Sequence, residues 1–251
     1  MRAIDLNADL GETVDGRPTA DDEAMFALVS SASVAAGGHA GDAESMRDAV
    51  ARAARHGVAL GGHPSFPDRA GFGRVPMPMA PAELRAAVAA QLHALADAGA
   101  DPRYVKPHGA LYHVAGADPV SAVAVVEAVL ELADRAGRAL PVLGLGDALA
   151  DATAAAGLPF RREAFLDRGY LPDGTLVPRG EPGDLLHDAA EVAARAVRLA
   201  ERGEVVAVDG TVLTTDAVSL CLHGDTPAAV AMARRVRRAL DTRGITVRAP
   251  W

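Results

Sequence analysis

Residues 1–12 read MRAIDLNADLGE, and the order of apolar and polar residues in this stretch predicts an extended strand with two different faces. Ile4 and Leu6 fall on one face of an extended strand, while Asp5 and Asn7 fall on the other. No GxGxxG fingerprint follows this first strand. The stretch therefore favours a strand with a polar inner face over the first strand of a dinucleotide-binding open sheet.

The same alternation of a short β-rich run and a helical pattern continues to the end of the chain. Asp118-Pro119 and Thr226-Pro227 are typical helix starts, with a capping side chain before a proline. Repeated strand–helix units predict parallel strands, and seven of them favour a closed α/β barrel. The predicted strands are residues 2–7, 33–36, 58–61, 104–106, 141–145, 160–165 and 218–222.

No linker or low-complexity tract interrupts this pattern, so we expect one barrel domain over residues 1–251. Residues 166–182 are rich in glycine, proline and charge, which indicates a long functional loop. Residues 204–215 carry Asp209-Gly210 between two β-rich runs, which predicts a hairpin at the barrel rim.

Composition narrows the function classes. The net charge of -8 argues against a nucleic-acid surface, which needs clustered basic residues. The single cysteine, Cys221, excludes an internal disulfide and fits a reducing compartment. No run approaches the roughly 20 apolar residues of a membrane span, and no secretory signal is visible. We expect a cytoplasmic protein.

Polar motifs stand at the carboxyl ends of the predicted strands, where barrel active sites form. Strand parity turns five of these side chains into the barrel: Asp5, Asn7, His63, Lys106 and His223. Histidines occur at four separate strand ends: His39, His63, His108 and His223. Lys106 is the only lysine in an arginine-rich chain, which indicates a need for its compact ammonium group.

The residues alone leave the chemistry open. The histidines with Asp5 and Asp9 could hold a divalent metal or act as general acids and bases. Lys106 and Arg168 could bind an anionic substrate or stabilise an oxyanion. The sequence contains no HExxH helix, GxSxG elbow or phosphate-binding P-loop. A Walker-type ATP site is excluded, because the one lysine has no such context.

Five further motifs occur in a fixed order: His39-Ala-Gly-Asp42, Gly62-His63-Pro64, Gly71-Phe-Gly-Arg74, Val105-Lys-Pro-His-Gly-Ala-Leu-Tyr112 and Asp167-Arg168. With these motifs the chain resembles the LamB/YcsF family over nearly its whole length. Members of that family are the A subunits of bacterial 5-oxoprolinases. The departures are Ala8 and Ala36, where the family often has cysteine, Gly38 in place of an aromatic residue, and Val75 in place of a basic one.

The resemblance implies a seven-stranded, TIM-like (β/α)7 barrel related to carbohydrate deacetylases. It also implies ATP-dependent hydrolysis of 5-oxo-L-proline to L-glutamate together with partner subunits B and C. ATP would serve as co-substrate, at a site shared with or located on the partner subunits. Phosphorylation of the amide oxygen would create a leaving group, after which water attacks the ring carbon.

On this basis we predict a catalytic set of Asp5, His63, Lys106 and His108. The predicted substrate-binding set is Asn7, Asp9, His39, Asp42, Arg74, Glu163, Asp167, Arg168, His223 and Asp225. Asp42 precedes a helix and has an equal claim to be its N-cap, and Asp225 has an equal claim to orient a neighbouring loop. A bound divalent metal is left open, with no assigned ligand set.

Two other functions compete with this one. The chain could be a stand-alone metal-dependent amidohydrolase or deacetylase, with Asp5, His39 and His63 as ligands. It could also be a non-catalytic, ligand-binding subunit whose polar pocket captures a metabolite. Activity without ATP would favour the first, and turnover that survives replacement of Lys106 and His108 would favour the second.

Overall fold

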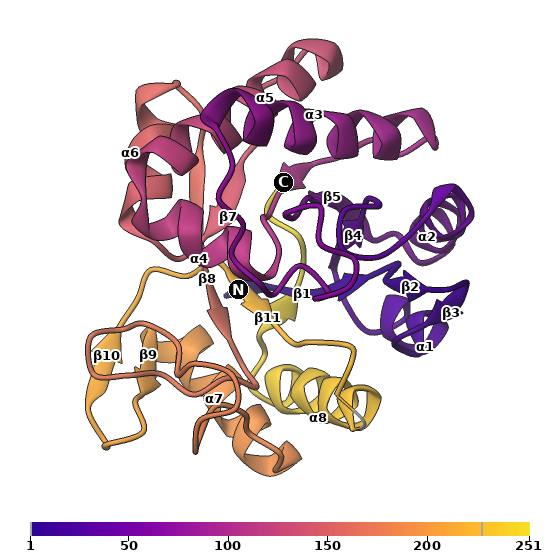
Figure 1. Cartoon of the computed structure of the whole chain (residues 1–251). Helices are drawn as coiled ribbons and strands as arrows, with labels where there is room; N and C mark the ends of the chain where they lie inside the picture. Colours follow the sequence, from indigo (N-terminus) through magenta and orange to yellow (C-terminus); the bar gives the residue numbers. More distant parts are fainter. Residues whose placement is uncertain (1, 227) are drawn as a thin grey trace.

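The centre of the molecule is a closed barrel of seven parallel strands, seen in the computed structural model, which describes residues 2–226 and 228–251 (Figure 1). Neighbouring strands follow chain order, and the pairing of β11 with β1, with Asn7 opposite Cys221, closes the barrel. The predicted α/β barrel is confirmed, with strand ends shifted by a few residues. The strands are β1 (Ala3–Leu10), β4 (Ser31–Ala35), β5 (Ala59–His63), β6 (Tyr104–Val105), β7 (Val142–Gly144), β8 (Phe160–Phe165) and β11 (Ser219–Cys221).

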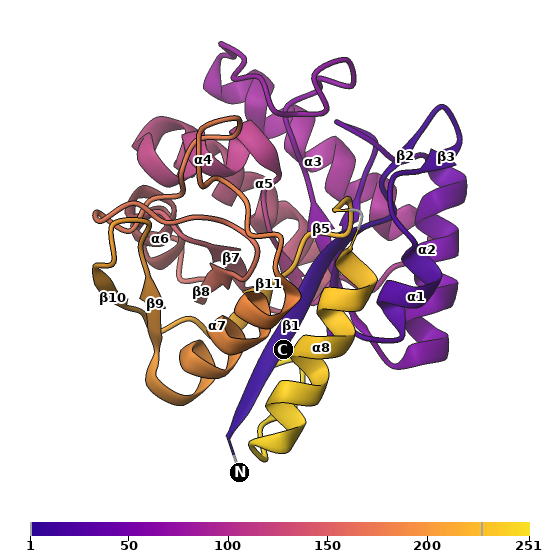
Figure 2. The ribbon, with the colours of Figure 1, turned by 90° about the horizontal axis from the view of Figure 1, so that it is seen from below.

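Helices surround the strands, as Figures 1 and 2 show. They are α1 (Asp22–Phe26), α2 (Ala43–His56), α3 (Pro81–Asp97), α4 (Gly109–Ala117), α5 (Pro119–Ala136), α6 (Asp147–Ala155), α7 (Ala189–Arg202) and α8 (Ala229–Thr242). Asp118 caps α5 as expected, since its side chain accepts from the Ser121 backbone N–H. The other expected start, Thr226-Pro227, includes Pro227, which lies outside the described residues.

The strands alternate an outer apolar face with an inner face that carries the polar residues. On β6, Val105 packs outward with the helices, whereas Tyr104 and the following Lys106 are buried on the inner side. Gly61 on β5 has no side chain because a Cβ there would lie 2.4 Å from the Tyr104 ring. Gly62 points outward, where a Cβ would meet Leu92 of α3 at 2.5 Å. The predicted parity of these strands is therefore confirmed.

The amino-terminal end of the barrel is filled by aromatic and hydroxyl side chains. Trp251 stacks on Tyr104 with ring centroids 4.4 Å apart, and its Nε1 donates to Ser31 Oγ. Strand β12 (Thr246–Val247) brings the chain there by pairing with the start of β1. This end is packed, so access to the barrel interior comes from the opposite, carboxyl end.

Two antiparallel pairs decorate the barrel. β9 (Glu204–Val206) and β10 (Val212–Thr214) pair in the segment around Asp209-Gly210, and lie at the periphery in Figures 1 and 2. β2 (Thr13–Val14) and β3 (Arg17–Pro18) form a second, unpredicted pair.

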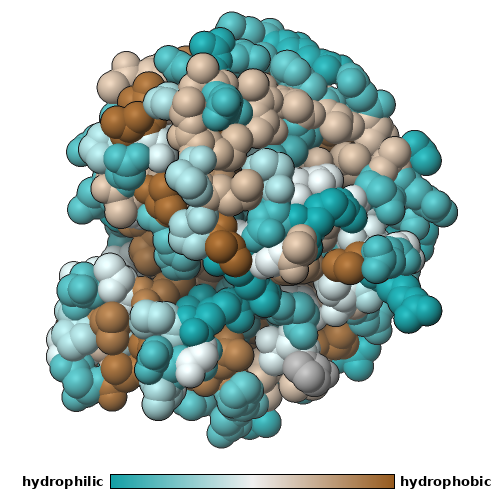
Figure 3. Space-filling model, in the orientation of Figure 1, coloured by the Kyte–Doolittle hydropathy of each residue, from teal (hydrophilic) through white to brown (hydrophobic). Residues whose placement is uncertain are grey.

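On the face in Figure 3, hydrophobic side chains occur in small groups among hydrophilic ones. In the described chain no single helix suffices to cross a membrane. Of the described helices, only α4 and α5 taken together are long and apolar enough, and the chain bends by 115° between them.

Asp5 lies near the closed end of the barrel, where three serines donate to its carboxylate. Ser30 and Ser31 donate to Oδ1 at 2.6 and 2.7 Å, and Ser219 donates to Oδ2 at 2.5 Å. Burial still outweighs these hydrogen bonds and raises the pKa of Asp5 to about 6. The folded protein therefore prefers the protonated acid, and ionisation of Asp5 opposes folding.

Replacing Asp5 with asparagine should change how stability depends on pH. The native acid loses stability as pH rises from its unfolded pKa through its folded pKa of about 6, whereas asparagine does not titrate. Relative to Asp5→Asn, the wild type should therefore lose about 3 kcal/mol between about pH 4 and about pH 7.5. Urea unfolding of both proteins across this range measures the difference. A constant difference would show that the Asp5 pKa is not raised.

Candidate active site

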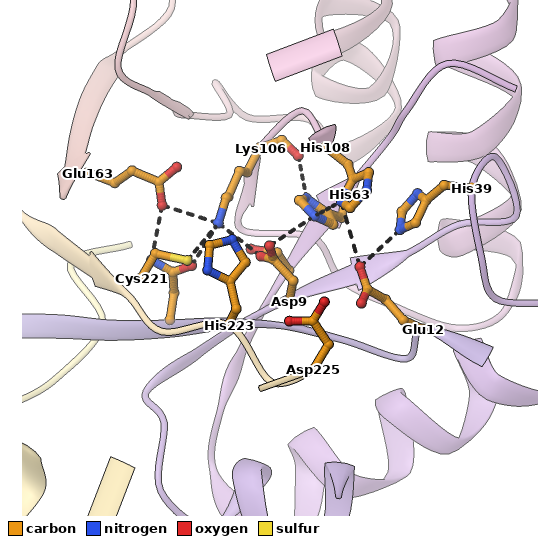
Figure 4. Close-up of polar contacts among 12 residues, drawn as sticks. Asp9, Glu12, His39, His63, Lys106, His108, Glu163, Cys221, His223 and Asp225 are labelled. Atoms are coloured by element: carbon orange, nitrogen blue, oxygen red, sulfur yellow. Dashed lines mark hydrogen bonds and ion pairs between the residues drawn. The ribbon is translucent and has the colours of Figure 1, made fainter. Parts of the chain in front are cut away.

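A cavity of about 400 Å³ opens at the carboxyl ends of the barrel strands. Its size is typical of small-molecule sites. Figure 4 shows the polar residues around it converging from different strands. Of the predicted residues, eight line the cavity: Asp9, His63, Arg74, Lys106, His108, Arg168, His223 and Asp225. These eight predicted residues therefore do lie together at the carboxyl end of the barrel, around one cavity.

Lys106 is buried at the centre of the polar network. Its Nζ donates to Asp9 Oδ1 at 2.9 Å and to Asn7 Oδ1 at 3.2 Å, and it pairs with Glu163 Oε2 at 3.2 Å. Burial acts to lower the pKa of Lys106, but the nearby carboxylates of Asp9 and Glu163 outweigh it and raise that pKa well above its ordinary value. The site therefore contains a fixed ammonium ion beside the cavity.

His223 and Asp167 form a second unit. The His223 ring Nδ1 lies 3.0 Å from Asp167 Oδ1, and the His223 backbone N–H donates to Asp167 Oδ2 at 3.2 Å. Burial acts to lower the pKa of His223, yet the Asp167 carboxylate raises it overall. Asp167 thus fixes the Nδ1–H tautomer and leaves Nε2 free to take up a proton, an arrangement typical of a general base.

Three histidines gather on the other side of Asp9, around Glu12. His39 and His108 stack with ring centroids 3.6 Å apart, and His63 meets His108 nearly edge to face. Burial lowers the pKa of both His39 and His108, so these rings are neutral near pH 7. Glu12, His39, His63 and His108 each offer one ligand atom, and these atoms lie within 4.8 Å of one another, so the group could hold a metal ion.

A second group of possible ligands consists of Asp9, Cys221 and His223. Its Cys221 thiol lies 3.2 Å from the Lys106 ammonium. Because Lys106 is a fixed cation, it repels a second cation at this point. The histidine group is therefore the better of the two metal sites among the described residues. Asp5, one of the three ligands expected for a stand-alone metal enzyme, belongs to neither group.

Several predicted residues support the cavity without lining it. Asn7 bridges Lys106 and Ser219, Glu163 pairs with Lys106, and Asp167 orients His223. His39 is buried behind the cavity and bonds to Glu12 at 3.1 Å. These side chains position other groups and do not face the cavity themselves. Asp5, predicted to be catalytic, also lies away from the cavity, among its three serines.

Arg168 and Arg74 occupy the cavity wall differently. Arg168 is buried, with Nε donating to the Asp184 carbonyl and Nη2 to the Val177 carbonyl, so its guanidinium is held in place by two backbone carbonyls. Arg74 is exposed and pairs with Asp225 at 2.8 Å. Arg168 thus presents a fixed positive charge, whereas Arg74 and Asp225 form an ion pair at the mouth.

Asp42 is the N-cap of α2 in this structure. Its exposed side chain accepts from the backbone N–H groups of Glu44 and Ser45, both at 2.9 Å, and Ser45 donates back in a capping box. This contact explains the aspartate without any ligand. Asp42 does not line the cavity, so its predicted substrate-binding role has no support in the geometry.

We expect Asp42→Ala to lower the free energy of unfolding by about 1 kcal/mol, the usual value of an N-cap. The affinity for substrate should stay within experimental error, because the side chain lies outside the cavity. Thermal unfolding and steady-state kinetics on the same preparation separate the two effects. A large rise in KM with an unchanged melting temperature would restore the substrate-binding role.

The cavity also contains residues that were absent from the predicted sets. Among them are Glu12, Tyr112, His113, Phe165, Leu176 and Arg179. Glu12 follows the polar face of the first strand, and Arg179 lies in the glycine- and proline-rich loop of residues 166–182, so both have a local signal in the sequence. Phe165 and Tyr112 resemble core residues in sequence, and only the closed barrel turns them toward the cavity.

Comparison with known proteins places this site in a family. The model of the LamB/YcsF family matches residues 4–250. The chain belongs to the LamB/YcsF family. It is 51% identical to the 5-oxoprolinase A subunit of Streptomyces griseus, covering 98% of this chain and 99% of that protein. The corresponding protein of Methylococcus capsulatus is 50% identical, with 99% and 96% covered.

Solved structures agree with the LamB/YcsF assignment. The lactam utilization protein from Thermus thermophilus is 41% identical with a TM-score of 0.91, covering 98% of this chain and 99% of that one. The T48 deacetylase is 12% identical with a TM-score of 0.50, covering 98% and 87%. The latter resemblance concerns the fold alone, and it shows that the two proteins share a barrel fold.

One departure from the LamB/YcsF pattern has a structural explanation. A Cβ on Gly38 would lie 2.2 Å from Gln91 Oε1 and 2.4 Å from Ser65 Oγ. The Gln91 amide instead fills this space and bonds to the backbone of Ser65 in both directions. Gln91 and Ser65 therefore occupy the space beside residue 38, so an aromatic residue there would require these two side chains to move.

Proposed function

We propose that this chain is the A subunit of a cytoplasmic 5-oxoprolinase, which hydrolyses 5-oxo-L-proline to L-glutamate with ATP and with partner subunits B and C. The observation that carries the proposal is about 50% identity, over nearly the whole of both chains, to proteins named as the A subunit of 5-oxoprolinase. The similarity to a lactam utilization protein supports the same class of substrate.

The cavity has the charges that such a reaction needs. Arg168, held by two backbone carbonyls, is suited to the substrate carboxylate. Lys106 is suited to negative charge that develops on the lactam oxygen or on a phosphate attached to it. Both groups are fixed before substrate arrives, so little reorganisation is needed on binding.

Opening the lactam requires a base for water and an acid for the ring nitrogen. His223, oriented by Asp167, is placed to take the proton from water as it attacks the ring carbon. The same imidazolium can then return a proton to the departing nitrogen. Transfer of the ATP γ-phosphoryl group to the amide oxygen would precede this attack, at a site shared with or located on the partner subunits. Expulsion of the ring nitrogen then leaves the phosphate on the new acyl carbon, and attack of a second water on that carbon releases inorganic phosphate and L-glutamate.

The test is glutamate release from 5-oxo-L-proline, measured with and without ATP, using this chain alone and then with subunits B and C. Release that requires both ATP and the partners is the expected result. Release by the chain alone without ATP would favour a metal-dependent amidohydrolase. Unchanged turnover by a complex that carries Lys106→Met would make the chain a ligand-binding subunit.

A further inference from the structure

His63 and His108 face each other through two ring nitrogens that are both hydrogen-bond acceptors when the rings are neutral. His63 Nε2 and His108 Nδ1 are 2.9 Å apart. The other nitrogen of each ring meets a backbone carbonyl: His63 Nδ1 lies 2.8 Å from the Lys106 oxygen, and His108 Nε2 lies 3.0 Å from the Phe72 oxygen. A carbonyl only accepts, so those nitrogens carry the hydrogens. In the neutral rings the two facing nitrogens therefore both present lone pairs.

Two carboxylate oxygens converge on the same point. Asp9 Oδ2 lies 3.3 Å from His63 Nε2, and Glu12 Oε1 lies 3.6 Å from His108 Nδ1. An ionised carboxylate also only accepts. With both carboxylates ionised, four acceptor atoms therefore approach one another in a buried place (Figure 4). Such an arrangement is repulsive unless positive charge lies between the atoms.

We propose that a divalent transition-metal ion binds here, with His63 Nε2, His108 Nδ1 and Glu12 Oε1 as ligands and Asp9 Oδ2 beside them. Ligands about 2.1 Å from one ion lie about 3.0 to 3.4 Å from each other. The separations of 2.9, 3.3 and 3.6 Å among these donors bracket that distance. A shared proton would satisfy two of the four acceptors, whereas an ion satisfies all of them.

His39 is a positioning residue in this site. Its ring is parallel to that of His108 within 3°, with centroids 3.6 Å apart. Lone pairs of two stacked rings run side by side and do not meet at one ion. His39 Nε2 instead lies 3.1 Å from Glu12 Oε1 and donates to it. The carbonyl partners of His63 and His108 play the same orienting part, as is usual around metal ligands.

The donor set selects the class of ion. Two imidazole nitrogens with carboxylate oxygens suit zinc, iron, cobalt, nickel or manganese, while magnesium and calcium prefer oxygen alone. The four acceptor residues all line the cavity, so solvent or substrate can reach the ion. A bound ion of this kind lowers the pKa of a water ligand. His63 and His108 then serve as ligands and not as the proton carriers expected from sequence.

Metal binding by the isolated chain tests this inference separately from oxoprolinase activity. Tag-free protein stripped with a chelator should bind about one Co²⁺ or Zn²⁺ per chain in calorimetric titration, and Mg²⁺ should not saturate. His63→Ala and His108→Ala should weaken binding by about 100-fold or more, and His39→Asn by about 10-fold to 100-fold. His187→Ala is the matched control, since His187 is exposed and outside the cluster, and should bind as the wild type does.

Nitrogen-15 spectra of the wild-type histidines complete the test without any variant. Zn²⁺ should shift His63 Nε2 and His108 Nδ1, while their other ring nitrogens remain protonated. Absence of saturable binding by the wild type would overturn the proposal, as would unchanged binding by folded His63→Ala and His108→Ala. Where these variants do not fold, unshifted ring nitrogens in the wild type decide against the site.

Discussion

Lys106→Met should abolish turnover by the assembled enzyme, with a loss of about 10³-fold or more. Methionine has similar length but no charge, so the cavity loses its fixed cation. Asp9 and Glu163 then remain buried near each other without a counter-charge, which costs about 3 to 5 kcal/mol. Urea unfolding near neutral pH should show this loss.

A double variant separates the two effects. Lys106→Met with Glu163→Gln removes one charge of each sign, so we expect most of the lost stability to return. Turnover should stay abolished, because the cation is still absent. Lys106→Arg should also fail, since the compact ammonium group touches Asn7, Asp9 and Cys221 at once and a planar guanidinium cannot. Near-normal turnover in Lys106→Met would remove Lys106 from the mechanism.

The barrel could be predicted from the sequence because strands and helices are encoded by residues close together in the chain. A strand has a period of two residues, so the contrast of Ile4 and Leu6 with Asp5 and Asn7 already assigns the inner face of β1. Seven strand–helix units then leave few topologies other than a barrel. Strand ends were less accurate: β1 runs to Leu10, because the closed barrel pairs Asp9 and Leu10 with β4, and no local pattern records that pairing.

The sequence predicted which side chains come together at the site, but not which of them contact one another. Parity and strand ends brought Lys106, His63, His108 and His223 together, since all such ends meet at one rim. Their division into a histidine cluster and an Asp167–His223 pair depends on contacts between distant segments, such as Glu12 with His39. Asp5 shows the limit of parity: it does face inward, but too deep in the barrel to reach the cavity.

Asp167→Asn should lower kcat by about 10²-fold to 10⁴-fold with little change in KM. Asp167 accepts from both the His223 backbone N–H and the ring Nδ1–H. An asparagine whose oxygen keeps the backbone bond turns its NH₂ group toward Nδ1. The ring must then carry its hydrogen on Nε2, and it can no longer accept a proton from water. The loss thus falls on the chemical step and not on binding.

Steady-state kinetics and the pH–rate profile of the assembled enzyme measure this effect. The raised pKa of His223, sustained by the Asp167 carboxylate, should fall in the variant, so any limb of the profile that reports His223 should move to lower pH. Asp173→Asn is the matched control, because Asp173 lies in the same loop, is exposed, and bonds only to Thr175. If Asp167→Asn retained both kcat and the profile, Asp167 would be a structural partner of His223, and the base would have to be sought elsewhere in the cavity.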